Sequence, residues 1–414
     1  MRNYPIEKVS YCAICDRKIV LAYLIQLRGN QVEMSASSFK RSDINLTNWR
    51  ERPYSTWTFQ NASEIVPSAQ IRSARLEEQP AKPLGSFAGL KIANVAGVEL
   101  GLEDFLVESN SDSLVIMRKG EVIAEWYAPH VDPSLPHMIF SISKSVTGLL
   151  AGILEGEGKL SFDDQVAKYI PEVTGSAYDE LTVRDLFNMT VSIDFEELYL
   201  DRNGAFDRYR RAMLWNPERA DDPTPTLREL MCKLPRASHP HGTRHAYRSP
   251  NADMAGLVVE AASGRRYAEF LSDALWRPMG AYTDGFITVD RAGNPRSSGG
   301  ISVTARDLAR LGDLVRQGGK GIVPAEFVEK LWAGGDREVW SRGDQRLLYP
   351  GGSYLAYWYE TGTGALAGMG IFGQSVWIDR KSDTVIVRHS SETIPVNDSL
   401  DQRVIAMMKE ISAS

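Results

Sequence analysis

Ser141 and Lys144 lie three residues apart at the start of an apolar run, in the stretch HMIFSISKSVTGLLAGILEGEG at residues 137–158. On a helix, side chains at this spacing are neighbours on one face. The backbone N–H of a serine that opens the helix lies where the helix dipole favours a negatively charged oxygen. A neutral lysine amine removes the serine proton if burial lowers the lysine pKa from its usual value of about 10.4. The pair therefore predicts a serine nucleophile with a lysine base.

The same spacing also has an ordinary interpretation. Serine is a common helix N-cap, and a lysine one turn into a helix is often simply solvated. Ser-x-x-Lys also occurs at Ser37 and Lys40, in SSFK, where no apolar helix follows. The spacing alone does not decide between the two interpretations, so the surrounding elements must.

The residues that follow Ser141 favour a buried helix. Gly156 stands near a plausible helix end, and Gly148 and Gly152 would allow close packing. Such burial is what a lysine base requires. The apolar positions at helical spacing are Val146, Leu149, Leu150, Ile153 and Leu154.

Strand signals stand on both sides of a long helical stretch. Residues 113–127 form two β-rich runs around Lys119-Gly120, a pattern typical of a hairpin, and strand character returns at residues 354–390. Residues 160–290 are mostly helical, and the last helix is amphipathic. We therefore predict an α+β fold with one antiparallel sheet flanked by helices plus an inserted, mostly helical lobe, and a site in the cleft between them.

The chain is predicted to have two parts. Residues 1–90 form an N-terminal extension and wrapping segment, and residues 91–414 form the main domain, with its helical lobe at about 160–290. The aromatic-rich stretch 49–72 is expected to wrap across the surface of this domain. Residues 199–225 mix charges and turn residues, which indicates a long loop.

The composition excludes several classes of partner. Of the 414 residues, 43% are hydrophobic and 24% are charged, which is typical of a globular protein with a large core. A net charge of −6 leaves no basic footprint, so we expect no nucleic-acid partner. No stretch approaches the roughly 20 apolar residues that span a bilayer, so we expect no membrane partner. Three cysteines fit a reducing compartment, and we place the protein in the cytoplasm.

Two groups of metal-ligand residue types are weak signals. Cys12 and Cys15 form a lone Cys-x-x-Cys without a second pair. His239, His241 and His245 cluster in ASHPHGTRHAY, where Pro and Gly indicate a loop and no acidic residue stands at ligand spacing. We therefore predict neither a metal site nor a cofactor.

The stretch FSISKSVTGLLAGILEGEGKLSFDDQVAKYIPE, followed by LTVRDLFNMT, resembles the serine β-lactamase-like superfamily, which includes penicillin-binding proteins, class C β-lactamases and their esterase and amidase relatives. In that superfamily a Ser-x-x-Lys motif opens the central helix. The resemblance extends in matching order over roughly residues 95–410. It implies that Ser141 is the nucleophile and Lys144 its base.

The resemblance also implies a second motif, Tyr-x-Asn or Ser-x-Asn, about a hundred residues further on. HAYRSPNADMAGLVVEAASG contains both Tyr247-Arg248-Ser249 and Ser249-Pro250-Asn251. In the esterase-like branch the tyrosine lies nine positions before a helical glycine, which fits Tyr247 and Gly256. We favour Tyr247, whose phenol would pass a proton to the leaving group. The alternative is a tyrosine packed at a lobe boundary.

The third motif of the superfamily, Lys-Thr-Gly on a strand beside the site, is missing. GMGIFGQSVWID stands at the corresponding place, and a glycine-flanked strand still brings a backbone N–H close to an acyl oxygen. The N–H groups of Ser141 and Ile371 are therefore the expected oxyanion donors. The cation that grips a β-lactam carboxylate is lost, and the Glu-x-x-Leu-Asn element of class A enzymes is also missing. Both differences argue against an antibiotic-hydrolysing enzyme.

Several stretches, including DFEELYLD and TARDLAR, are most similar to the 6-aminohexanoate-dimer (nylon-oligomer) hydrolases and neighbouring carboxylesterases. By that resemblance Tyr199 hydrogen-bonds the substrate amide, and Ser249, Gly370 and Phe372 contact the substrate. Tyr199 could also be a loop aromatic that covers the lobe. The carboxylate that holds the substrate amine in that family cannot be assigned to a residue here, because the Arg-rich loop after Tyr199 departs from the family pattern, and this argues against hydrolysis of the amide dimer itself.

We therefore predict a serine hydrolase that cleaves ester or linear amide bonds of small substrates through an acyl-enzyme on Ser141. Two alternatives stay open. The first is a D-amino-acid peptidase or amidase of the penicillin-binding type, and the second is a non-catalytic binding protein on the same fold. A homodimer is left open as well.

Overall fold

A computed structural model describes residues 39–77 and 79–414 of the chain. The chain divides after Ile44 into two units, and every strand that the structure describes belongs to the unit Asn45–Ser414. Cys12, Cys15 and Ser37, which the sequence analysis considered, lie outside the described residues.

The main sheet has seven antiparallel strands in the order β5-β4-β13-β12-β11-β10-β9. The predicted hairpin is confirmed, because Lys119 (φ 51°) and Gly120 (φ 85°) both adopt the left-handed conformation that a tight β-hairpin turn requires. The strands are β4 (Ser111–Arg118), β5 (Glu121–Tyr127), β9 (Ser353–Leu355), β10 (Trp358–Glu360), β11 (Ala365–Gly370), β12 (Gln374–Asp379) and β13 (Thr384–Ser390).

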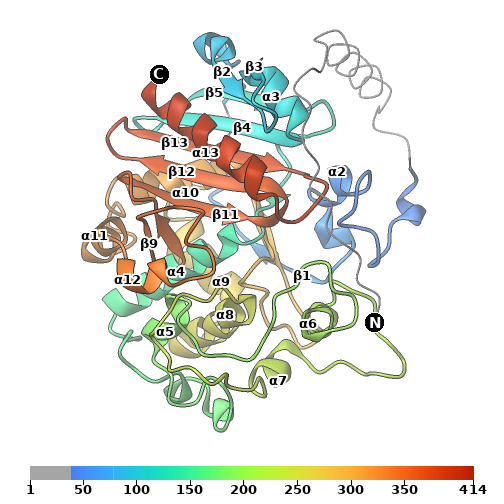
Figure 1. The fold of residues 1–414 in the computed structure, drawn as a ribbon, viewed down its shortest axis with the longest axis vertical. Coiled ribbons are helices and arrows are strands. Elements are labelled where there is room, and N and C mark those ends of the chain that lie inside the picture. The colour runs from blue at the N-terminus through green and yellow to red at the C-terminus, as the bar shows by residue number, and fades with distance from the viewer. Residues whose placement is uncertain (1–38, 78) are drawn as a thin grey trace, which may run out of the picture. The chain divides into compact units, whose positions relative to one another are not determined.

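Strands from the two ends of this unit meet in the middle of the sheet. β4 pairs with β13 over their full length, with Val115 opposite Val387. Both strands are buried along almost all of their residues, so helices must cover both faces. In Figure 1 the C-terminal helix α13 (Asp398–Ala413) passes in front of the sheet, and α10 (Ala305–Arg316) lies behind it. The predicted α+β fold with an antiparallel sheet and covering helices is confirmed.

A second antiparallel sheet, in the order β1-β7-β8-β6, is an addition to the single sheet that the sequence predicts. Its strands are too short to show a period of two, since they are β1 (Ser68–Ile71), β6 (His137–Met138), β7 (Gly285–Thr288) and β8 (Ile301–Val303). β6 leads directly into Ser141, so this sheet holds the approach to the candidate nucleophile. A third pair, β2 (Lys91–Ala93) and β3 (Glu99–Gly101), precedes α3 (Leu102–Glu108).

The helix behind Ser141 is α4 (Ile142–Gly156), and it is buried from Ile142 to Leu154. It packs on α8 (Ser249–Ser263) and on β11 and β12. Glycines on its length allow backbone and rings to come close, because a Cβ at Gly148 would lie 2.1 Å from the Ala356 carbonyl oxygen and one at Gly152 would lie 2.4 Å from the Phe327 ring. The predicted buried helix and its end at Gly156 are confirmed.

The regular elements between β5 and β9 are mainly helices, together with the short strands β6, β7 and β8. The loop predicted at 199–225 is wrong in part, because this range contains one helix, α6 (Ala205–Ala212). The shorter helices of residues 160–290 are α5 (Val183–Phe187), α6, α7 (Leu227–Met231) and α9 (Tyr267–Leu271), with a π-helical turn at Ser272–Trp276 and 3-10 turns at Val166–Lys168 and Pro171–Val173. Elsewhere lie α2 (Ser55–Thr58), α11 (Ala325–Ala333) and α12 (Arg337–Ser341).

The aromatic stretch 49–72 contributes to the core. Trp49 and Phe59 have no exposed surface, whereas the sequence analysis expected this stretch to wrap across the surface. Phe59 packs edge-on against Phe140 at 4.9 Å between ring centroids, and Trp49 packs edge-on against Trp215 at 5.4 Å. The stretch therefore supports the loop that precedes Ser141. Within residues 39–77 and 79–414, no helix combines the length and the apolar character that crossing a bilayer requires.

Replacing Gly148 by alanine tests the close packing of α4. The clash with a backbone oxygen is expected to lower the free energy of unfolding by about 1–3 kcal/mol, even though alanine is the better helix former. Gly89→Ala is the matched control, because a Cβ there meets nothing within 4 Å, and it should change stability by less than ~0.5 kcal/mol. Urea unfolding followed by tryptophan fluorescence measures both variants. Equal stabilities would contradict the packing.

Candidate active site

The chain reaches Ser141 through a strained turn. Phe140, which is buried between Phe59 and Phe372, has a φ of 43°, a conformation that is unfavourable for a bulky residue. Such strain persists where packing holds it and is found most often at functional sites. Ser141 is the N-cap of α4, yet its side chain makes no capping hydrogen bond. The hydroxyl is therefore available for another role.

The Lys144 side chain is buried, with 1% of its surface exposed, and it points back at Ser141. Its Nζ donates to Ser141 Oγ at 2.8 Å and to the Ser298 carbonyl oxygen at 2.7 Å. Burial lowers the pKa of Lys144 from 10.5 to about 7, and the charge of Glu197 partly opposes this shift. Near neutral pH, a large share of the Lys144 side chains is thus the free amine that can accept a proton.

Ser298 is held in place by a buried ion pair. Asp253 of α8 accepts the Ser298 N–H at 2.7 Å through one oxygen, and its other oxygen pairs with the Arg296 guanidinium. Asp253 is fully buried and Arg296 is 5% exposed. A buried carboxylate needs such a partner, because burial of an unpaired charge is costly. The pair therefore fixes the carbonyl that Lys144 contacts.

Tyr247 lies over the amine of Lys144. The distance from Lys144 Nζ to the centre of the Tyr247 ring is 4.8 Å, and Ser141 is among the side chains that influence the pKa of the phenol. Burial, together with the charge of Glu197, raises the pKa of Tyr247 well above its ordinary value, so the phenol keeps its proton. Asn251, from the competing Ser-x-Asn interpretation, instead accepts from the Tyr178 hydroxyl in the core. The structure therefore brings Tyr247, and not Asn251, to Ser141 and Lys144.

Glu197 links the other two predicted polar residues. Its carboxylate accepts from the Tyr199 hydroxyl at 2.6 Å and from Ser249 Oγ at 2.7 Å, and it also accepts the Ser249 N–H at the start of α8. A carboxylate at a helix start is favoured by the helix dipole. The role of Glu197 is not apparent from the sequence, because nothing in EELYLD indicates that this residue caps a helix some fifty residues away.

The glycine-flanked turn lies against the start of α4. A Cβ at Gly370 would be 3.0 Å from the Ser141 backbone nitrogen, so this position leaves no room for a side chain. Ile371 follows in a 3-10 turn (Ile371–Gly373), in which Phe372 has a φ of 60°. Gly370 therefore lies against the Ser141 backbone nitrogen, and Ile371 follows it directly in the chain.

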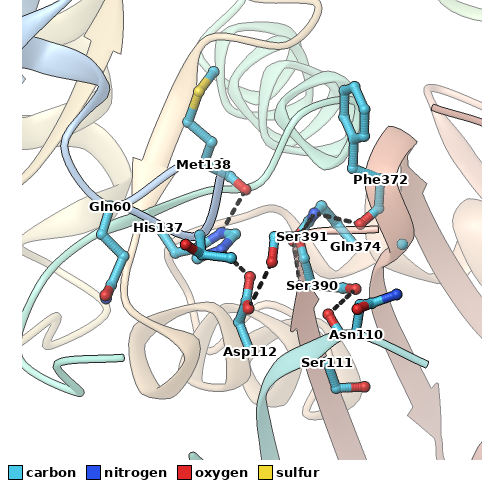
Figure 2. Close-up of polar contacts among 12 residues, drawn as sticks. Gln60, Asn110, Ser111, Asp112, His137, Met138, Phe372, Gln374, Ser390 and Ser391 are labelled. Carbon is cyan, nitrogen blue, oxygen red and sulfur yellow. Dashed lines mark hydrogen bonds and ion pairs between the residues drawn. The ribbon is translucent and has the colours of Figure 1, made fainter. Parts of the chain in front are cut away.

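A buried polar network supports this turn from behind (Figure 2). Gln374 Nε2 donates to the carbonyl oxygens of Phe372 at 3.1 Å and Ser390 at 2.6 Å. Asp112 of β4 bonds His137 Nε2 at 3.0 Å and accepts from Ser391 Oγ at 2.9 Å. Because His137 belongs to β6, the network joins the approach to Ser141 with the turn at Phe372.

A cavity of about 580 Å³ opens above these residues. Of the predicted site residues, Ser141, Tyr199, Ser249, Ile371 and Phe372 line it, whereas Lys144, Tyr247 and Gly370 are not part of the lining. The volume is in the range of small-molecule sites. The lining serine therefore faces the cavity, and its activating groups lie behind it.

Histidines of the predicted cluster make separate contacts in the structure. His241 Nδ1 accepts the Ser192 N–H at 2.9 Å, and His245 is buried beside Trp340 and Tyr354. In the part of the chain that the structure describes, no three His, Cys, Asp or Glu residues gather in a way that could hold a metal ion.

Comparison with known proteins assigns this fold and site to a family. The sequence model of the family described as Beta-lactamase matches residues 103–406. This match spans well over half of the chain, and it includes Ser141, Lys144 and Tyr247. The chain belongs to the β-lactamase family of serine hydrolases.

Its relatives are named for a narrower activity. The chain is 36% identical to the 6-aminohexanoate-dimer hydrolase of Paenarthrobacter ureafaciens over 352 residues, which is 84% of this chain and 88% of that protein. A solved structure described as "Putative 6-aminohexanoate-dimer hydrolase from Bacillus anthracis" has a TM-score of 0.81 at 21% identity and covers 91% of this chain and 98% of that one. EstCE1, a hydrolase with promiscuous acyltransferase activity, has a TM-score of 0.56 at 18% identity, over 73% of this chain and 95% of its own. The last two likenesses show the shared fold.

Replacing Asp253 by asparagine tests the buried ion pair. The change leaves the Arg296 charge buried without its partner, so we expect a loss of about 3–5 kcal/mol in the free energy of unfolding. Asp163→Asn is the control, because Asp163 pairs with Arg184 on the surface, and a surface pair contributes at most about 1 kcal/mol. Urea unfolding compares the two variants. If Asp253→Asn were no less stable than Asp163→Asn, the supporting role of the pair would be refuted.

Proposed function

We propose that this protein hydrolyses ester and linear amide bonds of small substrates through an acyl-enzyme on Ser141. The observation that carries the proposal is the 2.8 Å contact between Lys144 Nζ and Ser141 Oγ, made by a buried lysine whose pKa is lowered to about 7. A lysine with this pKa is a competent base near neutral pH. The relative named 6-aminohexanoate-dimer hydrolase supports a small hydrolysable substrate, and the acyltransferase activity named for EstCE1 supports an acyl-enzyme.

In the acylation step, Ser141 Oγ attacks the substrate carbonyl carbon while its proton passes to Lys144 Nζ. The new ammonium keeps its hydrogen bond to the Ser298 carbonyl oxygen, which stabilises the charge as it forms. The carbonyl oxygen becomes an oxyanion at the N–H groups of Ser141 and Ile371. This arrangement uses the helix start and the glycine-flanked turn as the two donors.

Tyr247 is the proposed acid for the leaving group. Its raised pKa keeps the phenol protonated, so it donates a proton to the departing alcohol or amine and regains one from the Lys144 ammonium. Deacylation reverses the roles of the groups: water attacks the acyl carbon and its proton passes to Lys144, which then gives a proton to Ser141 Oγ as the bond between the acyl carbon and Oγ breaks. A phenolate would be a less suitable base here, because its formation is opposed by burial and by Glu197.

Replacing Ser141 by alanine tests the nucleophile. We expect turnover of a p-nitrophenyl short-chain ester and of a linear aliphatic amide to fall at least about a thousandfold, because the acyl-enzyme cannot form. A fluorophosphonate probe should label the wild type at Ser141 and leave the variant unlabelled. Ser145→Ala is the matched control, since Ser145 lies in the same helix and donates to the Tyr357 carbonyl oxygen in the core.

Two results would speak for the alternatives. Retained turnover in Ser141→Ala would refute the assignment of the nucleophile. An unlabelled and inactive wild type would indicate a binding protein on this fold. A preference for D-amino-acid peptides over aliphatic esters would instead indicate a peptidase of the penicillin-binding type.

The pH dependence of kcat/KM tests Lys144 as the base. Because the free amine is the active form, kcat/KM should rise with pH through about 7, the pKa of Lys144. The Glu197 charge raises this pKa, so Glu197→Gln should move the rise to lower pH. The neighbouring Glu196 is exposed, and Glu196→Gln should leave the midpoint unchanged. A midpoint that stays fixed or moves to higher pH in Glu197→Gln would contradict this electrostatic account.

A further inference from the structure

Three arginines of the cavity lining have no ion-pair partner among residues 39–77 and 79–414. Arg50 donates to the Trp215 carbonyl oxygen at 2.8 Å and to Asn216 Oδ1 at 2.6 Å. Arg210 donates to the Tyr199 carbonyl oxygen, and its guanidinium lies 4.4 Å from the centre of the Phe206 ring. Arg52 donates to Asn110 Oδ1. All three side chains are half-buried and are held by neutral groups.

The acidic residues of the lining are all engaged elsewhere. Glu51 pairs with Arg202 at 2.9 Å. Asp207 pairs with Arg211 and Arg219, each at 3.1 Å, and Glu218 pairs with Arg291. Arg296, the remaining arginine of the lining, is paired with Asp253. Among the charged residues of the lining, Arg50, Arg52 and Arg210 are therefore the ones without an ion-pair partner in the described part of the chain, and all three are positive.

Two of these cations are close enough to disfavour one another. Burial lowers the pKa of Arg50 to about 9, and the charge of Arg210 is the next largest cause. Burial likewise lowers the pKa of Arg210 to about 10. Half-buried guanidinium groups that line one cavity and have no ion-pair partner are an unfavourable arrangement. A bound anion would relieve it, and planar guanidinium groups are well suited to grip a carboxylate.

We infer that this cavity takes substrates that carry a carboxylate, which Arg50 and Arg210 bind while Ser141 faces the scissile carbonyl. This inference rests on the proposed function and adds the charge of the substrate to it. Arg52 adds a third positive charge to the same cavity, on the stretch that also holds Arg50. Both of these residues precede the part of the chain that the family model matches, residues 103–406. The stretch before residue 103 therefore contributes to specificity.

Three matched esters test the charge preference. They are mono-p-nitrophenyl adipate, its neutral methyl ester, and a p-nitrophenyl ester whose acyl chain ends in a trimethylammonium group. We expect kcat/KM for the anionic ester to exceed that for the neutral ester by at least about tenfold, the effect of one charge-assisted hydrogen bond. The cationic ester should be the poorest of the three.

A second pair of esters shows on which side of the scissile bond the carboxylate binds. In p-carboxyphenyl pentanoate the carboxylate is on the leaving group, and its methyl ester is the neutral match. A preference for the anion in the adipate pair places the guanidinium groups on the acyl side, and a preference in the carboxyphenyl pair places them on the leaving-group side. Either preference supports the inference.

The variant Arg210→Gln connects the preference to the residue. The ratio of kcat/KM for the anionic ester over the neutral ester should fall by about tenfold or more relative to the wild type. A ratio cancels any general loss of activity or of folded protein. Arg265→Gln is the control, because Arg265 is exposed and pairs with Asp273 outside the lining. Its ratio should equal that of the wild type.

The two proposals fail in different ways. If the wild type hydrolyses neutral esters through Ser141 but shows no preference for the anion in either ester pair, the carboxylate inference is overturned and the proposed function stands. A preference that persists in both Arg210→Gln and Arg50→Gln would also overturn it. If Ser141→Ala retains turnover, the proposed function itself fails.

Discussion

The structure depends on keeping the Lys144 amine buried and without a carboxylate partner. A buried Lys144 that paired with an acid would hold its proton well above neutral pH, and a solvated one would do the same. The fold avoids both outcomes, because the contacts of Lys144 Nζ are a hydroxyl and a carbonyl oxygen. Tight packing of α4 excludes water, and the glycines of this helix make that packing possible. The proposed chemistry follows from this constraint.

The charges near Lys144 are each satisfied by other groups. Asp253 is occupied by Arg296 and by the Ser298 N–H, and Glu197 is occupied by Tyr199 and Ser249. These carboxylates therefore act on the amine only through space, and burial remains the largest influence on its pKa. The same hydrogen bonds orient Ser298 and the start of α8. Asp253 and Glu197 thus position their neighbours and also influence the pKa of Lys144.

The sequence was most informative where the signal is local. The Lys119-Gly120 hairpin, the helix after Ser141 and its glycines could be predicted from spacing alone. The second sheet could not, because strands of two to four residues carry no period. Ser298, Asp253 and Glu197 were missed for a different reason. Their roles come from contacts between residues far apart in the chain, and no pattern in Asp253 or Arg296 alone indicates the pair that they form.

The pairing of β4 with β13 and the contact of Gly370 with Ser141 have a consequence for biosynthesis. Ser141 is translated more than two hundred residues before Gly370, and β11 to β13 are therefore made long after it. A nascent chain therefore carries Ser141 without the turn at Ile371, without β13, which pairs with β4, and without β11 and β12, which pack on α4. Domains fold as units once their sequence is available. A chain that ends before β11 thus lacks one of the two proposed oxyanion donors, so the proposed site is completed only after these strands have been made.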